Sequence, residues 1–185
     1  MTTLVILGVI AAIAFYGVAI YNRLVKNRQM VKEGWSGIDV QLKKRANLIP
    51  NLVAAVKGYM KHERGLLEKI TELRAKAIKM EDATPAERSA IEQQISRTLG
   101  QINIAVENYP DLKANQNVLD LQQQLAEVED GIQMSRRYYN GAVRNNNVLV
   151  ESFPSNLIAN YFHFEKADYF ELENDADRAV PKVEL

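Results

Sequence analysis

Apolar residues in the first 80 positions follow two different patterns. Residues 4–20 form one uncharged run, LVILGVIAAIAFYGVAI. From residue 24 to residue 77, apolar positions instead recur every three or four residues, as at Leu42, Ala46, Ile49, Val53 and Val56. That spacing predicts a helix with one buried face. We expect the run to continue into this stretch as one helix reaching residue 80, a rod about 115 Å long.

The same spacing predicts two further helices and no strands. Residues 84–87, Thr-Pro-Ala-Glu, form a capping box with proline at the first helical position, so a second helix starts there. A third helix carries apolar residues over 118–143 at nearly strict heptad spacing, as in a bundle or coiled coil, and is stopped by FPSN at residue 153. The segment LIANYFHF that follows is expected to dock on the end of the bundle.

The apolar run is predicted to anchor the chain in a membrane. Leu4 to Ile20 extend roughly 25 Å as a helix, slightly less than a hydrocarbon core of about 30 Å. Tyr21 is placed near an interface, and Arg23 and Lys26 can reach toward headgroups. Cations follow the run rather than precede it, which favours an uncleaved single-pass anchor over a signal peptide. The positive-inside rule then predicts an outer N-terminus and a cytoplasmic body. A buried core helix of a soluble protein is the less favoured alternative.

Charge divides the chain, although 23 basic and 23 acidic residues give a formal net charge of zero. Residues 23–80 contain 14 Lys and Arg against 5 Asp and Glu, whereas residues 165–185 contain 3 against 7. We expect a transmembrane anchor over 1–22, a cytoplasmic helical bundle over 23–170 and an acidic mobile tail over 171–185. The opposite charges favour attraction within the chain, between copies of it, or to an anionic surface.

Recognisable catalytic chemistry is not found in the sequence. The absence of cysteine excludes thiolate metal sites and cysteine nucleophiles. A di-iron site would need Glu-x-x-His pairs, but Tyr59 and Asn160 precede His62 and His163 by three residues. No phosphate-binding loop or dinucleotide fingerprint occurs. We therefore expect no enzyme activity, no metal or other cofactor, and no nucleic-acid partner.

Pro50 and the cations before it form one candidate interaction surface. Pro50 lies within the first helix, where it removes a backbone donor, so we expect a kink with its open side facing solvent. Lys43, Lys44 and Arg45 are interpreted mainly as a solvated face. Contact with an acidic surface of another subunit, the tail or lipid is the alternative.

Trp35 and a cluster of acidic residues are further candidates. Trp35 lies between Gly34 and Gly37, and we expect it to pack in the bundle with the glycines allowing a close backbone approach; a subunit contact is the alternative. Glu129 and its acidic neighbours at 127 and 130 are interpreted as a polar face, or as partners for cations of the first helix.

Several long stretches resemble the LemA family of bacterial membrane proteins. They include WSGIDVQLKKR with LIPNLV close behind it, YPDLKANQNVLDLQQQLAEVEDGI, RRYYNGAVRNNN and FPSNLIANYFHF. The similarity runs from Tyr21 to about Phe170. It implies an all-α fold in which one N-terminal transmembrane helix continues into an up-and-down, antiparallel bundle of long helices at the bacterial inner membrane. It brings no established activity and no catalytic residues, although some members are linked to membrane zinc proteases.

Two functions are consistent with these features. The favoured hypothesis is a structural protein in the lipid bilayer that forms homo-oligomers through its long helices and organises or shapes the membrane. The alternative is an adaptor for a membrane enzyme such as a zinc protease, with the segment containing Phe153 and Phe162 as part of its docking surface.

Overall fold

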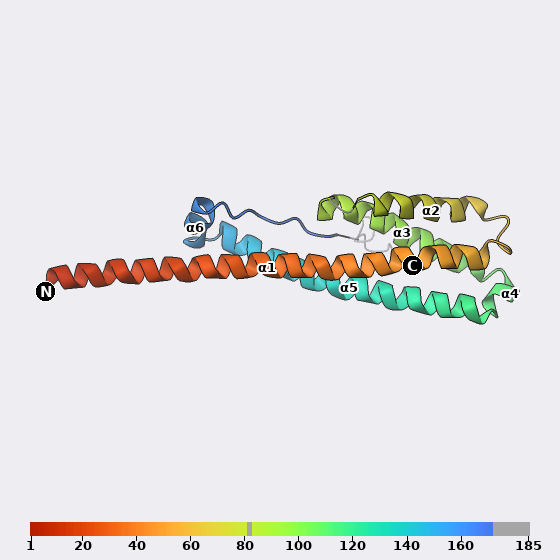
Figure 1. The fold of residues 1–185 in the computed structure, drawn as a ribbon, viewed down its shortest axis with the longest axis horizontal. Helices are drawn as coiled ribbons and strands as arrows, with labels where there is room; N and C mark the ends of the chain where they lie inside the picture. Colours follow the sequence, from red (N-terminus) through yellow and green to blue (C-terminus); the bar gives the residue numbers. More distant parts are fainter. Residues whose placement is uncertain (81–82, 172–185) are drawn as a thin grey trace, which may run out of the picture. The chain divides into compact units, whose positions relative to one another are not determined.

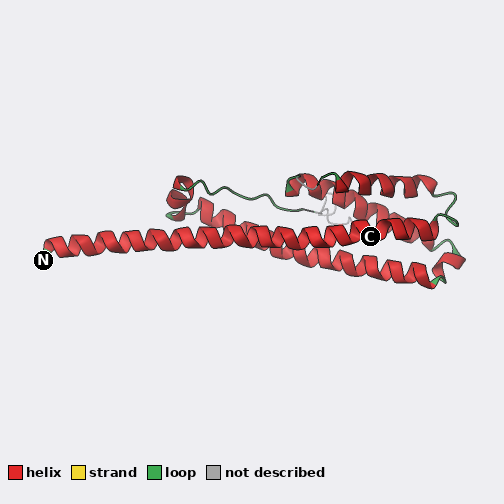
Figure 2. Cartoon of the chain, viewed as in Figure 1, coloured by secondary structure: helices red, strands yellow, loops and turns green. Residues whose placement is uncertain are grey.

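The computed structural model describes residues 1–80 and 83–171 of the chain. All regular structure in these two ranges is helical, as Figure 2 shows. The helices are α1 (Thr2–Val56), α2 (Arg64–Ile78), α3 (Pro85–Val106), α4 (Pro110–Lys113), α5 (Gln116–Glu151) and α6 (Ser155–Tyr161). The predicted all-α class is confirmed. Residues 172–185 of the predicted acidic tail lie outside the described residues.

The first helix begins as predicted but ends earlier. The apolar run and the amphipathic stretch form one unbroken helix, α1, which ends at Val56 rather than at residue 80. The chain turns through residues 57–63, and α2 begins at Arg64. The turn is seven residues long, close to two helical turns, so the apolar spacing stays in phase across it and hides the break. The single rod predicted over residues 4–80 is therefore wrong.

One compact unit of the described chain contains residues 40–132 together with Phe170. In this unit the end of α1, then α2, α3 and the first half of α5 run in alternating directions (Figure 1). Their shared core contains Ile49, Leu52, Val56, Met60, Leu67, Ile70, Leu73, Ala77, Ile95, Leu99, Ile102, Val106, Leu112, Val118 and Leu125. Folding α2 back onto α1 lets two apolar stripes bury each other, which a straight rod would not allow.

The start of α3 follows the predicted capping box. The Glu87 backbone N–H donates to the Thr84 hydroxyl at 3.3 Å, and the Thr84 N–H donates to the Glu87 carboxylate at 2.9 Å. Hydrogen bonding to Thr84 lowers the pKa of Glu87. The carboxylate is thus kept ionised at the positive end of the helix.

Pro50 is accommodated inside α1 by a contact from α2. The helix continues through Pro50, which is exposed. Proline leaves the carbonyl four residues earlier, that of Ala46, without its usual helical donor. Arg74 of α2 supplies one: its Nε donates to the Ala46 oxygen at 2.6 Å. The helical disruption is thereby compensated by the neighbouring helix.

The second compact unit contains residues 1–39 of α1 and residues 133–169. Here α1 packs against α5 through Gly34. A Cβ added at Gly34 would lie 3.0 Å from the Tyr139 Cα and 3.1 Å from the Tyr138 ring, whereas one at Gly37 would meet nothing closer than the Ser135 hydroxyl at 3.9 Å. The predicted close backbone approach is confirmed at Gly34.

Gly34→Ala and Gly37→Ala are expected to change stability in opposite directions. The added methyl at residue 34 meets backbone that cannot rotate away, so stability should fall by about 1–3 kcal/mol. At residue 37 there is room, and stability should rise by about 0.5–1 kcal/mol because alanine is the better helix former. Thermal unfolding of both variants in detergent, followed by circular dichroism, measures this; equal shifts would contradict a tight contact at Gly34.

Candidate functional site

The beginning of α1 has the surface of a membrane-spanning helix. It is the one helix among the described residues that is long and apolar enough to cross a bilayer, and only 6% of its most apolar window is buried by the rest of the chain. Leu4 is 75% exposed. A soluble core helix would be covered by its own protein, so this exposure favours a lipid environment. Arg23 and Lys26 are exposed just after the span, as an interfacial role requires.

The helix α6 packs against α1 where the apolar run ends. Ile20 and Leu24 of α1 are buried with Ala159 of α6 and with Phe164. Tyr21 contacts two aromatic rings edge to face, with centroid separations of 4.8 Å to Phe162 and 5.7 Å to Phe164. The Arg28 guanidinium lies 4.8 Å from the centroid of the Phe164 ring. The segment LIANYFHF thus docks as predicted, and its docking site is the base of the anchor.

Trp35 and the surrounding side chains of α5 form a packed layer in the same unit. The Trp35 ring is half-buried, 5.7 Å from the Tyr139 ring. The Tyr139 hydroxyl donates to the Asp168 carbonyl at 2.7 Å, and burial, with a further contribution from Asp168, raises its pKa to about 12. Tyr139 therefore stays neutral and fixes the segment after α6 to α5. Whether Trp35 also contacts a second subunit stays a prediction.

Arg45 is the predicted interface residue whose environment differs most from expectation. Lys43, Lys44 and Pro50 are exposed, but Arg45 is only 1% exposed. Its two terminal nitrogens donate to the Glu92 carboxylate at 2.7 Å and to the Glu129 carboxylate at 2.6 Å. The interpretation of Arg45 as part of a solvated face is wrong. The alternative pairing of Glu129 with a cation of the first helix is confirmed.

The Arg45 ion pairs belong to a network that joins α1, α2, α3 and α5. Arg88 donates through Nε to the other oxygen of Glu92 at 2.8 Å, and through Nη1 to the carbonyl of Ala77 at 2.6 Å. Arg88 and Glu92 are both at least 95% buried. Two cations and two carboxylates balance in charge, which buried ionic groups require.

Sequence reasoning did not identify Arg88 and Glu92 as partners of Arg45. A signal was present, since residues 88, 92, 95 and 99 follow each other at helical spacing and the last two, Ile95 and Leu99, belong to the buried stripe of α3. A charged pair in phase with such a stripe indicates buried charges. Arg45, Arg88 and Glu92 are nearly fully buried, and Glu129 at the edge of the network is 35% exposed.

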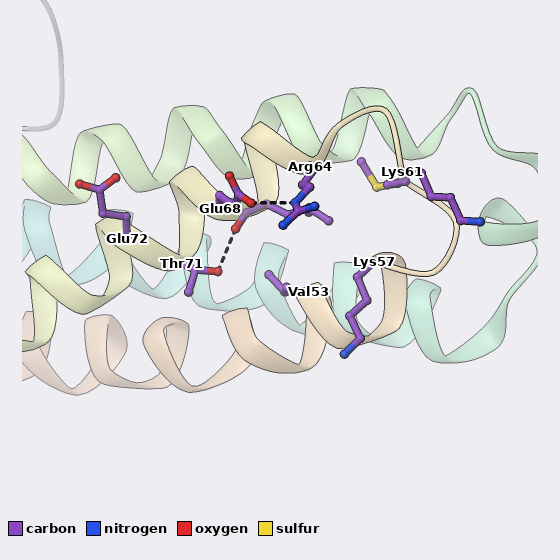
Figure 3. A pocket seen from close by; sticks show the side chains of 9 residues that line it. Val53, Lys57, Lys61, Arg64, Glu68, Thr71 and Glu72 are labelled. Carbon is purple, nitrogen blue, oxygen red and sulfur yellow. Dashed lines mark hydrogen bonds and ion pairs between the residues drawn. The ribbon is translucent and has the colours of Figure 1, made fainter.

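An open groove of about 810 Å³ lies between the end of α1 and the start of α2. Figure 3 shows Lys57, Lys61 and Arg64 around it, with Glu68 paired to Arg64 at 2.9 Å. Its apolar part is formed by Val53, Met60 and Leu67. Glu68 and Glu72 also line the groove, so three cations and two carboxylates lie around its apolar floor. Among the described residues, no group of three acidic or histidine side chains is placed to hold a metal ion.

The remaining predicted interface residues lie on the surface of α6 and the turn before it. Phe153 is 79% exposed and Phe162 is 48% exposed. Phe162 nevertheless contacts Tyr21 of α1, so it helps to hold α6 in place. The sequence identified both residues as interface candidates without indicating that Phe162 lies beside the end of the apolar run.

Comparison with known proteins gives a consistent assignment. The model of the LemA family matches residues 34–185. Protein LemA of Metamycoplasma hominis is 29% identical over 75% of this chain, and the matched part spans 63% of that relative's length. Magnetosome protein MamQ 2 of Paramagnetospirillum magneticum is 22% identical over 98% of this chain and 76% of its own length. Magnetosome protein MamQ of Magnetospirillum gryphiswaldense is 21% identical over 94% of this chain and 74% of its own length. With its bare apolar helix leading into a helical bundle, this membrane-associated chain belongs to the LemA family.

Proposed function

We propose that the chain is a non-enzymatic structural protein that is anchored in the bacterial inner membrane, self-assembles through its long helices and organises or shapes that membrane. The observation that carries the proposal is the continuity of α1, which passes from an uncovered apolar run into a packed bundle without a break. The same helix thus contributes both the apolar run and part of the packed core. Two relatives that match nearly the whole chain are magnetosome proteins, and their association with a cellular structure supports the proposal.

The orientation follows from the cations after the span. Arg23, Lys26, Arg28 and Lys32 are within ten residues of one another, while residues 2–22 carry no charge. Juxtamembrane cations are retained on the cytoplasmic side, where each contributes about 1 kcal/mol on an anionic leaflet. The N-terminus is then outside and the helical bundle is cytoplasmic.

Self-assembly is supported by an uncovered apolar stripe on α5. Met134, Tyr138 and Val148 are 60%, 46% and 54% exposed. Together with Gly141 and Asn145 they occupy positions separated by four, three, four and three residues, the spacing of a coiled-coil seam. A groove of about 380 Å³ beside Met134 and Tyr138, with Gly34 and Gly37 in its lining, can receive a side chain of a second copy.

Charging this stripe should dissociate the assembly. We expect the double variant Met134→Lys and Val148→Lys to place like charges on both sides of a self-complementary contact, and to shift the protein to single protomers. Sedimentation velocity in detergent measures the size. The matched control is Ile104→Lys with Leu119→Lys, which charges exposed apolar residues elsewhere and should leave the assembly intact. Wild-type protein that sediments as one protomer at all concentrations would contradict self-assembly.

An adaptor for a membrane enzyme, such as a zinc protease, is the second candidate. The groove with Lys57, Lys61 and Arg64 favours it, because an acidic segment of a partner would find both cations and apolar contacts there. Cross-linking in cells should then recover a stoichiometric foreign protein, and Lys57→Glu with Lys61→Glu should abolish that contact without affecting self-assembly. Recovery of self-contacts alone would favour the structural role.

A further inference from the structure

The turn before α6 and the helix itself present a cluster of uncovered apolar side chains. Phe153, Leu157 and Tyr161 are 79%, 59% and 77% exposed, and Phe162 beside them is 48% exposed. Residues 153–164, FPSNLIANYFHF, contain no Asp, Glu, Lys or Arg, in a chain in which 25% of residues are charged. Four large apolar side chains uncovered at one place indicate an interaction site rather than scattered surface residues.

One face of α6 is already used to hold it against α1. Ala159 is fully buried and Ser155 is 6% exposed, and Ile158 lies over Gly17, where an added Cβ would be 3.8 Å from its Cδ1. Leu157 and Tyr161 are four residues apart and therefore share a face one turn apart. The exposed apolar face is thus distinct from the face that packs on α1.

The position of α6 along α1 identifies what covers its exposed face. Gly17 lies three residues before the end of the apolar run at Ile20, and Arg23 lies three residues beyond it, each about 4.5 Å along the helix axis. Figure 1 shows α6 beside α1, with the N-terminal part of α1 continuing past it. If the run spans the bilayer, α6 lies at the boundary between acyl chains and headgroups, where Tyr is favoured and where interfacial helices place Phe and Leu on their apolar face.

A groove between the two helices extends this surface. It has a volume of about 340 Å³ and is lined by Ala14, Gly17, Val18, Tyr21, Ile158 and Phe162. Because the first three residues belong to the apolar run itself, the groove opens at the depth of the hydrocarbon edge. Its lining is suited to a lipid acyl chain and offers no charged group to a polar partner.

We propose that residues 153–162 form a second membrane contact, which inserts Phe153, Leu157 and Tyr161 into the headgroup region of the cytoplasmic leaflet beside the anchor. This inference rests on the membrane anchoring in the proposed function but not on self-assembly. Interfacial helices of this kind bury their apolar face about 5–10 Å into the boundary. Insertion into one leaflet adds area to that leaflet alone, which gives the anchor a direct means of bending the membrane.

Spin labels at single introduced cysteines test the contact, since the chain has no cysteine of its own. Full-length Leu157→Cys and Tyr161→Cys proteins are labelled and reconstituted in vesicles of phosphatidylethanolamine with a minority of phosphatidylglycerol. Collision with oxygen, which concentrates in lipid, is compared with collision with a water-soluble nickel chelate. Ile10→Cys, in the apolar run, is the hydrocarbon reference, and Leu119→Cys, exposed on α5, is the aqueous reference.

We expect both α6 labels to report a depth between the two references. If they match Leu119→Cys while Ile10→Cys lies in hydrocarbon, the anchor stands and the second contact is overturned. Low collision with both reagents would place α6 against another protein copy and would also overturn it. If Ile10→Cys itself is accessible from water, the membrane anchoring in the proposed function fails as well.

Discussion

Replacing Arg45 with methionine is expected to lower the free energy of unfolding by about 3–5 kcal/mol, because it breaks a buried ionic network by removing one partner. Glu92, which is 2% exposed, would lose the cation 2.7 Å away and keep only Arg88. Glu129 and the Ser96 hydroxyl would lose a shared donor at 2.6 Å from each. The remaining network would carry a net negative charge, with the Glu92 carboxylate buried away from water.

Thermal unfolding in detergent, followed by circular dichroism, measures this effect. For a chain of this size the midpoint should fall by roughly 6–20 °C. Lys44→Met is the matched control, since Lys44 is exposed and adjacent, and it should change the midpoint little. Glu129→Gln should have an intermediate effect because Glu129 is 35% exposed. An Arg45→Met midpoint equal to that of Lys44→Met would mean that the network contributes nothing.

Replacing Arg74 with methionine is expected to lower the free energy of unfolding by about 1.5–3 kcal/mol, the range for a hydrogen bond from a charged donor. The reason is specific to Pro50. The Ala46 carbonyl has no helical donor because proline lacks an N–H, and Arg74 supplies the replacement at 2.6 Å. Restoring the backbone donor with Pro50→Ala should therefore make Arg74 less important.

A double-mutant cycle over Pro50→Ala and Arg74→Met isolates this coupling. The cost of Arg74→Met should be smaller by about 1 kcal/mol in the Pro50→Ala background than in the wild type. Lys76→Met in both backgrounds is the control, because Lys76 is on the same helix and forms only a surface ion pair with Glu72. Identical costs of Arg74→Met in the two backgrounds would show that the Ala46 carbonyl does not depend on Arg74.

Part of the candidate site could be predicted from local sequence patterns, and part could not. The exposed ends of the anchor, Leu4 and Arg23, follow directly from the uncharged run and the cations after it. The neighbourhood of Gly34 and Trp35 was anticipated because glycines in a helix indicate close packing. Phe153 and Phe162 were identified as interface candidates, but no local feature of residues 153–162 shows where along α1 this segment packs. That position makes the segment a candidate for lipid contact. It depends on the contact of Ile158 with Gly17, a residue far away in the sequence.

The all-α class, the start of α3 at its capping box and the length of the apolar run could all be predicted from the residues alone. These depend on helical periodicity, caps and hydrophobicity, which act over a few neighbouring residues. The end of α1 at Val56 became evident only from the packed helices, since a turn of about two helical turns preserves the phase of the apolar stripe. The tertiary structure also decided the role of Arg45, whose partners Glu92 and Glu129 are 47 and 84 residues away. Whether a charge is buried depends on the helices that surround it. The periodic pattern along one helix does not show which residues of the other helices become its partners.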